Sequence, residues 1–157
     1  MASRVWVVDD DDSVREVLTA MLSELGYEAK GYADPHEALT AYVPGSAEVL
    51  ITDLRMPKMS GLELTRALLV KDPEAIVMVL TGYPSIPDAV EAVKSGATDF
   101  LSKPCRMEEI RIRVERALES RELQDRLKKT RSLTWVLIGS LPLWFVLGMV
   151  LARFVRW

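Results

Sequence analysis

The sequence predicts an α/β fold, a doubly wound parallel sheet of five strands with helices on both faces. Short apolar runs alternate with segments whose apolar residues recur every three or four positions, the spacing of a helix. Proline and glycine stand between these segments, where they end helices and form turns. Strands separated by helical segments are joined by right-handed crossovers, so they pair in parallel and bury both faces of the sheet.

In the first half of the chain we expect three strands, at residues 5–8, 27–31 and 49–52. The helix after the first strand opens at Asp12 or Ser13, either of which can cap it, and Gly26 ends it. The helix after the second strand begins with Asp34-Pro35, a capping residue followed by a first-turn proline, and runs through Tyr42.

In the second half we expect two further strands, at residues 76–80 and 99–102. Ser60 caps a helix that runs to about Lys71, and another helix covers residues 85–95 and stops at Gly96. A final helix begins near Met107. Its apolar stripe is expected to dock on the sheet through Ile110, Val114, Ala117 and Leu118.

Polar residues of different chemical kinds follow four of the five strands: Asp9 and Asp10, Asp53, Thr81, and Lys103. Ligands of such sheets bind beyond the carboxyl ends of the strands, so we expect these side chains to converge at one edge. Carboxylates, a hydroxyl and an ammonium can together hold a divalent cation, attack a phosphorus atom and neutralise phosphoryl oxygens. The pattern predicts a phosphoryl-handling site.

Within this set, Asp53 is central, and we expect it to be the nucleophile that becomes an aspartyl phosphate. Attack by one anion on another requires a cation, and Mg²⁺ prefers oxygen ligands. Asp10 and Asp53 are the expected direct ligands, with Asp9 direct or through water. Lys103 and Thr81 would each contact a phosphoryl oxygen.

Charge is distributed unevenly along the 157 residues, whose net charge is −3. Residues 1–105 carry 17 acidic and 9 basic side chains, and this acidic body argues against a nucleic-acid partner. No DNA-reading unit is expected after the first domain. The single cysteine, Cys105, excludes an intramolecular disulfide, and the N-terminal residues do not resemble a secretory signal peptide.

The C-terminal segment from Leu133 to Ala152 contains no charged residue. As a helix, its 20 residues would match the thickness of the hydrocarbon core of a bilayer. More basic residues precede it than follow it, which favours a single-pass orientation with the N-terminal domain in the cytoplasm. A buried helix that packs on a partner protein is the alternative. Leu123 and Leu127 before it could seed a coiled coil, or belong to a solvated helical linker.

Residues 4–118 resemble the receiver domain of two-component response regulators, especially receivers of the nitrogen-regulation and fixation type. The resemblance is carried by four motifs in order: Val7-Val8-Asp9-Asp10, Thr52-Asp53-Leu54-Arg55-Met56-Pro57 with Gly61, Thr81-Gly82, and Asp99-Phe100-Leu101-Ser102-Lys103-Pro104. It implies a flavodoxin-like sheet with the strand order 2-1-3-4-5. The family pair that follows the first strand selects Asp9 and Asp10, which leaves Asp11 and Asp12 as loop and cap residues.

The resemblance also implies further roles. The backbone carbonyl of Arg55 would join the Mg²⁺ ligands, and Thr81 and Phe100 would form a switch that responds to phosphorylation. Pro104 resembles the cis-proline junction of the family. Cys105 departs from the bulky apolar residue that is common there. His36, the single histidine, is expected at the surface and not as an internal phosphodonor.

These observations predict a receiver domain (residues 1–120), a basic helical linker (121–132) and a transmembrane anchor in the cytoplasmic membrane (133–157). We expect a phosphoacceptor that is not an enzyme. Its phosphodonor would be a sensor histidine kinase or a phosphotransfer protein. The chain would act by protein–protein contact without an output domain. Whether it forms a homodimer is left open by the sequence. Two alternatives are a phosphate-independent membrane adaptor and a haloacid-dehalogenase-type phosphatase, although Arg55 stands where such phosphatases have a second acid.

Overall fold

The computed structural model describes residues 2–124, 126 and 127. The chain divides into two compact units, Met1–Leu118 and Glu119–Trp157. Over the described residues, no helix is both long and apolar enough to cross a bilayer. The segment predicted to do so, residues 133–152, lies outside the described residues, as do residues 128–132 of the predicted linker.

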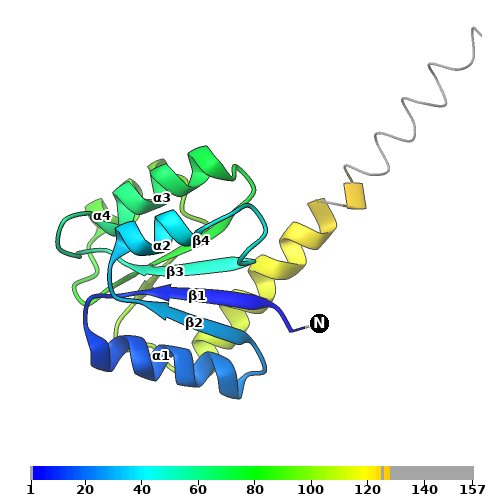
Figure 1. Ribbon diagram of the computed structural model, residues 1–157, viewed down its shortest axis with the longest axis horizontal. Coiled ribbons are helices and arrows are strands. Elements are labelled where there is room, and N and C mark those ends of the chain that lie inside the picture. The colour runs from blue at the N-terminus through cyan, green and yellow to red at the C-terminus, as the bar shows by residue number, and fades with distance from the viewer. Residues whose placement is uncertain (1, 125, 128–157) are drawn as a thin grey trace, which may run out of the picture. The chain divides into compact units, whose positions relative to one another are not determined.

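The first unit contains a five-stranded sheet in which every neighbouring pair of strands is parallel (Figure 1). The strand order is β2-β1-β3-β4-β5, which confirms the predicted flavodoxin-like fold and its topology. The strands are β1 (Arg4–Val8), β2 (Glu28–Tyr32), β3 (Val49–Asp53), β4 (Ile76–Thr81) and β5 (Asp99–Ser102).

Helices cover both faces of the sheet, as a doubly wound fold requires. α1 (Asp12–Glu24) lies on one face, and α2 (Pro35–Ala41), α3 (Gly61–Lys71) and α4 (Ile86–Lys94) lie on the other (Figure 1). A further helix covers residues 107–124. Its residues Ile110, Val114 and Ala117 are buried in the same cluster as Leu18 and Leu22 of α1, which confirms the predicted docking stripe.

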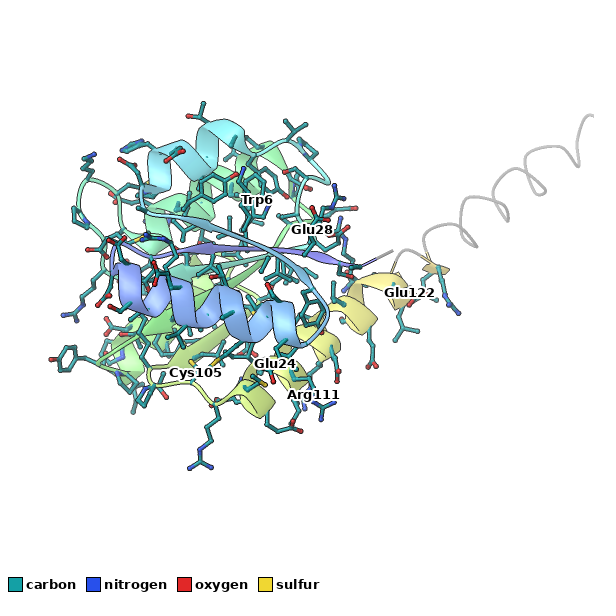
Figure 2. The ribbon with its side chains drawn as sticks, turned by 60° about the horizontal axis from the view of Figure 1, so that its bottom comes forward. Trp6, Glu24, Glu28, Cys105, Arg111 and Glu122 are labelled. Carbon is teal, nitrogen blue, oxygen red and sulfur yellow. The ribbon has the colours of Figure 1, made fainter. Side chains whose placement is uncertain are left out.

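The apolar core has two layers because successive strand residues point to opposite faces. On the α1 side, Val5 and Val7 of β1 pack in one buried cluster. On the α2 side, Trp6 and Val8 pack in another, and Figure 2 labels Trp6 there. Trp6 packs against Tyr32 with the two rings tilted by 49° and their centroids 4.7 Å apart. The continuous apolar runs in the sequence therefore reflect strands that are buried on both faces.

Helix boundaries follow the predicted caps, with one correction. Asp34 caps α2, Ser60 caps α3, and Gly26 has a φ of 88° just after α1 ends. The cap of α1, however, is Asp11, not Asp12 or Ser13: its carboxylate accepts hydrogen bonds from the backbone N–H groups of residues 13 and 14. The side chain of Asp12 is instead engaged one turn along the helix, by Arg15.

Candidate functional site

Strand register places two carboxylates side by side. β1 and β3 are paired so that Val8 lies opposite Thr52, and the residues that follow are Asp9 and Asp53. Both carboxylates are buried, with 1% of Asp9 and 7% of Asp53 exposed. Burial of two adjacent anions is unfavourable unless a cation compensates them.

The ammonium of Lys103 is that cation. It lies after β5 and forms ion pairs with Asp53 Oδ1 and with Asp9 Oδ2, the latter at 2.5 Å. Burial raises the pKa of Asp9, since the loss of hydration outweighs the hydrogen bonds from Lys103 and from the Asp11 N–H. Burial alone would lower the pKa of Lys103, but hydrogen bonds to Asp53 and Asp9 reverse this, so its pKa is raised and the ammonium stays charged.

The second oxygen of the Asp53 carboxylate is held by the loop that follows it. Asp53 Oδ2 accepts a hydrogen bond of 2.6 Å from the backbone N–H of Arg55. Gly61, the first residue of α3, lies so close that an added Cβ would collide with the main-chain oxygen of Asp53. The side chain of Arg55 is exposed and faces Asp88 of α4 at 3.7 Å. Asp53 is thus fixed through both of its carboxylate oxygens and through its backbone.

Thr81, at the end of β4, is 2% exposed and lines the same pocket. Its Oγ1 accepts a hydrogen bond of 3.2 Å from the N–H of Tyr83. Its carbonyl accepts a hydrogen bond of 2.7 Å from the N–H of Lys103, which ties the start of the Lys103 loop to β4. Because the hydroxyl oxygen acts as an acceptor, its own hydrogen can be donated to a ligand in the pocket.

The pocket at this edge has a volume of about 360 Å³. It is lined by every predicted reactive side chain, namely Asp9, Asp10, Asp53, Thr81 and Lys103, and by Arg55. Asp10 is exposed, and among the contacts of the described residues its carboxylate makes no hydrogen bond or ion pair. Over the same residues, no three Asp, Glu, His or Cys side chains are grouped closely enough to hold a metal ion. Lys103 instead lies between Asp9 and Asp53.

The remaining predicted residues lie around this pocket. Phe100 of β5 is partly buried and packs with Leu54, Val79 and Ala92. The peptide bond between Lys103 and Pro104 is cis, as the resemblance implied. Cys105, labelled in Figure 2, lines an adjoining groove, and burial raises the pKa of its thiol to about 11. His36 is exposed on α2, as predicted.

The arrangement combines a fixed carboxylate, a permanent ammonium and a hydroxyl donor within one pocket. These are the groups needed to take up an anionic phosphoryl group and to stabilise its oxygens. The sequence motifs correctly predicted that five side chains share this pocket, namely Asp9, Asp10, Asp53, Thr81 and Lys103. They did not identify Arg15, whose guanidinium contacts the Asp9–Asp12 turn. The sequence signal that could have identified Arg15 is its position three residues after Asp12 on the same helix, a spacing at which side chains interact.

Comparison with known proteins identifies the class. The family model for the response regulator receiver domain matches residues 5–115. The chain therefore belongs to the response regulator receiver domain family of two-component signalling. Receiver domains interact with sensor histidine kinases or phosphotransfer proteins, and they generally use Mg²⁺ for phosphorylation.

Individual relatives agree with this assignment. The chain is 34% identical to the C4-dicarboxylate transport transcriptional regulatory protein DctD of Rhizobium meliloti over 90% of its own length and 31% of that protein. It is 44% identical to the transcriptional regulatory protein FixJ of Azorhizobium caulinodans over 64% of its own length and 47% of that protein. A receiver domain structure from Clostridium thermocellum superposes with a TM-score of 0.74 at 28% identity, covering 78% of this chain and 98% of that one.

The chain thus spans about a third to a half of the length of these curated relatives. Both relatives are transcriptional regulators by name, so the comparisons do not support the predicted absence of a nucleic-acid partner. They lend no support to the predicted membrane anchor either. Both predictions rest on the sequence alone.

Proposed function

We propose that this chain is a phosphoacceptor whose nucleophile is Asp53. The observation that carries the proposal is the Lys103 ammonium, which contacts the buried carboxylates of Asp9 and Asp53 within one pocket. A partly buried lysine at this position supplies positive charge where the oxygens of an arriving phosphoryl group would lie. The phosphodonor is the phosphohistidine of a sensor histidine kinase or a phosphotransfer protein.

In the transfer, an oxygen of the Asp53 carboxylate forms a bond to phosphorus while the phosphorus–nitrogen bond of the donor breaks. The imidazole leaves and takes up a proton, so charge and atoms balance. The N–H of Arg55 holds one carboxylate oxygen at 2.6 Å, and Lys103 holds the other. The oxygen that attacks must give up its contact. Attack by Oδ1 would release Lys103, which could then pair with a phosphoryl oxygen.

The chemistry of the donor set suits a hard divalent cation, although the described carboxylates as they stand are not grouped closely enough to hold one. The donor atoms are all oxygens: the carboxylates of Asp9, Asp10 and Asp53, and the backbone carbonyl of Arg55. Lys103 already shows that positive charge is stabilised between Asp9 and Asp53, and the Asp10 carboxylate is available at the pocket wall. Bound Mg²⁺ would cancel the repulsion between Asp53 and the anionic phosphoryl group.

Thr81 and Phe100 are proposed to transmit the effect of Asp53 phosphorylation to the protein surface. The Thr81 hydroxyl donates its free hydrogen to a phosphoryl oxygen, and the partly buried ring of Phe100 turns inward behind it. Phe100 packs beside Ala92, the single buried residue of α4 over its described length. Movement of this ring therefore reshapes the surface made by α4 and β5.

A groove beside the pocket supports direct contact with a protein phosphodonor. Its volume is about 460 Å³, and it shares Val14 and Lys103 with the reactive pocket. Its walls are mostly apolar, and Val17 of α1 is 52% exposed there. An apolar groove next to a reactive carboxylate suits a partner that must bring its histidine to within bonding distance.

We further propose that residues 133–152 anchor the chain in the cytoplasmic membrane, with the receiver in the cytoplasm. The support is the length of the uncharged segment and its basic N-terminal flank. The phosphorylated form would then act on other proteins at the membrane surface, and its acidic body disfavours nucleic acid. Pairing of two copies is one form that such contact could take.

The chain is proposed to be modified once per cycle and not to turn over as an enzyme. Arg55, two residues after Asp53, is exposed and paired with Asp88, so no second carboxylate occupies that position to protonate a leaving group. Sustained hydrolysis of small phosphate esters in a steady-state assay would contradict this assignment.

The phosphoacceptor is tested by incubating the full chain with Mg²⁺ and acetyl phosphate, followed by intact-mass measurement. The wild-type chain should gain one phosphoryl group, Asp53→Asn should gain none, and the matched control Asp34→Asn should behave as wild type. Labelling of the Asp53→Asn variant would mean that another residue is the nucleophile. A wild-type chain that never labels would favour a phosphate-independent adaptor.

The anchor is tested by fractionation. The full chain should sediment with membranes, and removal of residues 132–157 should release the receiver into the soluble fraction. A reporter fused after Trp157 should lie outside the cytoplasm. A full-length chain that stays soluble would remove this part of the proposal.

A further inference from the structure

The turn from Asp9 to Asp12 places four carboxylates in succession, and three of them have partners. Asp9 contacts Lys103, Asp11 caps α1, and Asp12 pairs with Arg15. Asp10 is the exception among these described residues, since it forms no hydrogen bond or ion pair and lines the pocket. What directs its side chain must therefore act through the backbone.

Arg15 makes that backbone contact. One guanidinium nitrogen donates a hydrogen bond of 2.7 Å to the carbonyl of Asp9, and another pairs with the carboxylate of Asp12. The carbonyl of Asp9 belongs to the peptide unit that joins Asp9 to Asp10, so the contact fixes the plane from which Asp10 departs. The Arg15 side chain is only 16% exposed, which makes this contact more rigid than a typical surface pair.

Gly31 provides the space in which Arg15 lies. It belongs to the edge strand β2, opposite Val7 of β1. A Cβ at this position would meet the Arg15 Cγ at 2.9 Å and its Cδ at 3.1 Å. The stem of Arg15 therefore lies directly over the glycine, and a side chain at position 31 would displace it. Three features of the sequence, Arg15, Gly31 and the aspartate turn, form one structural unit.

We propose that Arg15 is a positioning residue, which holds the Asp9–Asp10 peptide so that the Asp10 carboxylate faces the pocket before a cation binds. The inference rests on the proposed function, because it assigns Arg15 a part in Mg²⁺ binding without contact to the ion. Mutation of residues that orient metal ligands in this way typically lowers metal affinity by about 10- to 100-fold.

The direction in which Mg²⁺ affinity changes when Arg15 is removed distinguishes a positioning role from a purely electrostatic one. Arg15 is a cation near a cation site, so its removal on electrostatic grounds alone would strengthen Mg²⁺ binding. Loss of positioning would weaken it. A role limited to stabilising α1 would alter unfolding without lowering the Mg²⁺ affinity of the folded chain.

The experiment is calorimetric titration of Mg²⁺ alone into the unphosphorylated full chain. Arg15→Met should bind Mg²⁺ about 10-fold more weakly than the wild type. Gly31→Val keeps the guanidinium but displaces its stem, so it should weaken binding in the same direction. Arg66→Met, which removes an arginine that pairs with Glu91 and does not line the pocket, is the matched control and should bind as wild type.

A second measurement uses acetyl phosphate at rising Mg²⁺ concentrations. The half-saturating Mg²⁺ concentration of Arg15→Met should rise by the same factor, while its labelling rate at saturating Mg²⁺ should approach that of the wild type. Thermal unfolding in EDTA shows whether each variant is folded. If Arg15→Met fails to fold, the Mg²⁺ affinity of Gly31→Val tests the positioning role instead.

The outcomes separate this inference from the function on which it rests. If the wild type binds Mg²⁺ and labels on Asp53, but both variants bind Mg²⁺ equally well or more tightly, the positioning role is wrong and the phosphoacceptor stands. If the wild type neither binds Mg²⁺ nor labels, both are overturned.

Discussion

The helices α3 and α4 follow the adjacent strands β3 and β4, whose ends line the same pocket, yet the two helices are held in different ways. α3 buries five residues, among them Leu64 and Leu68, and begins with a full capping box between Ser60 and Glu63. α4 buries only Ala92, whereas Ile86, Val90 and Val93 are exposed. Most helix stability in proteins comes from packing of an apolar face. α3 is therefore anchored, and α4 is held weakly.

The difference matches the position of each helix relative to Asp53. Gly61 at the start of α3 packs directly against the backbone of Asp53, so a rigid α3 fixes the proposed phosphoacceptor. α4 is tied to this side of the molecule by two exposed ion pairs, Arg55–Asp88 and Arg66–Glu91. A helix with so few buried contacts can be displaced at low cost, which suits the role proposed above for the surface made by α4 and β5.

The largest expected effect contrasts two deletions of equal size. Leu68→Ala in α3 removes a fully buried side chain and should reduce the free energy of unfolding by about 3 kcal/mol. Ile86→Ala in α4 removes a side chain that is 82% exposed and should cost less than about 0.5 kcal/mol. Urea denaturation measures both, and similar values would erase the distinction between the helices.

The two glycines that precede or begin these helices give the next contrast. Gly61→Ala should destabilise the domain by about 2 kcal/mol, because the new Cβ collides with the Asp53 carbonyl. It should also slow labelling of Asp53. Gly82→Ala before α4 should change stability by less than about 0.5 kcal/mol, since nothing lies within 4 Å of the new Cβ. A destabilised Gly82→Ala variant with an unaffected Gly61→Ala would reverse the comparison.

The capping box of α3 predicts a pH dependence that α4 lacks. Hydrogen bonds from the backbone N–H and the hydroxyl of Ser60 lower the pKa of Glu63. A lowered pKa stabilises the folded state above the usual glutamate pKa, and this contribution is lost as the pH falls through the folded value. Ser60→Ala should cost about 1 kcal/mol at pH 7, and less at pH 3.

Ser85→Ala, which removes the cap of α4 without a capping box, serves as the control. Its effect should be nearly the same at both pH values, since its hydroxyl accepts only from the N–H of Asp88. Unfolding curves at pH 7 and pH 3 for the two variants provide the comparison. A pH-independent effect of Ser60→Ala would show that Glu63 does not take part in the cap.

The smallest expected effect concerns the ion pairs. Arg66→Met removes a pair whose side chains are 53% and 57% exposed, and it should change stability by about 0.3 kcal/mol or less. Amide exchange within α4 is the sensitive measurement. A loss near 1 kcal/mol would mean that α4 is anchored electrostatically, and the contrast with α3 would be smaller than the packing indicates.

Much of the fold followed from local signals. The strand at residues 99–102 was predicted at its observed bounds, and the caps at Asp34 and Ser60 were predicted because their short polar side chains satisfy free N–H groups. The cap of α1 was predicted one or two residues too late, at Asp12 or Ser13 instead of Asp11. In a run of four aspartates every position offers the same carboxylate, so composition could not select Asp11 over Asp12.

Alternation along the strands explains why two of the reactive residues share a face of the sheet. Asp9 and Asp53 follow Val7 and Ile51 at a spacing of two, and both of those residues lie in the cluster on the α1 side. The strand ends in the sequence therefore predicted the sheet edge of the site, whereas its face became evident only from the structure. The sequence also predicts a membrane anchor, from the length of the uncharged segment and the charges that flank it, and this remains a prediction.

Only the tertiary structure decided which groups touch. Strand register set Asp9 beside Asp53, and the loop after β5 places the ammonium of Lys103, which is 94 residues from Asp9 in the chain, in contact with both. Likewise, the bare backbone of Gly31 gave Arg15 its place over the sheet. Contacts of this kind depend on how distant strands pair and on the space that remains between them, and neither quantity is encoded in any single segment.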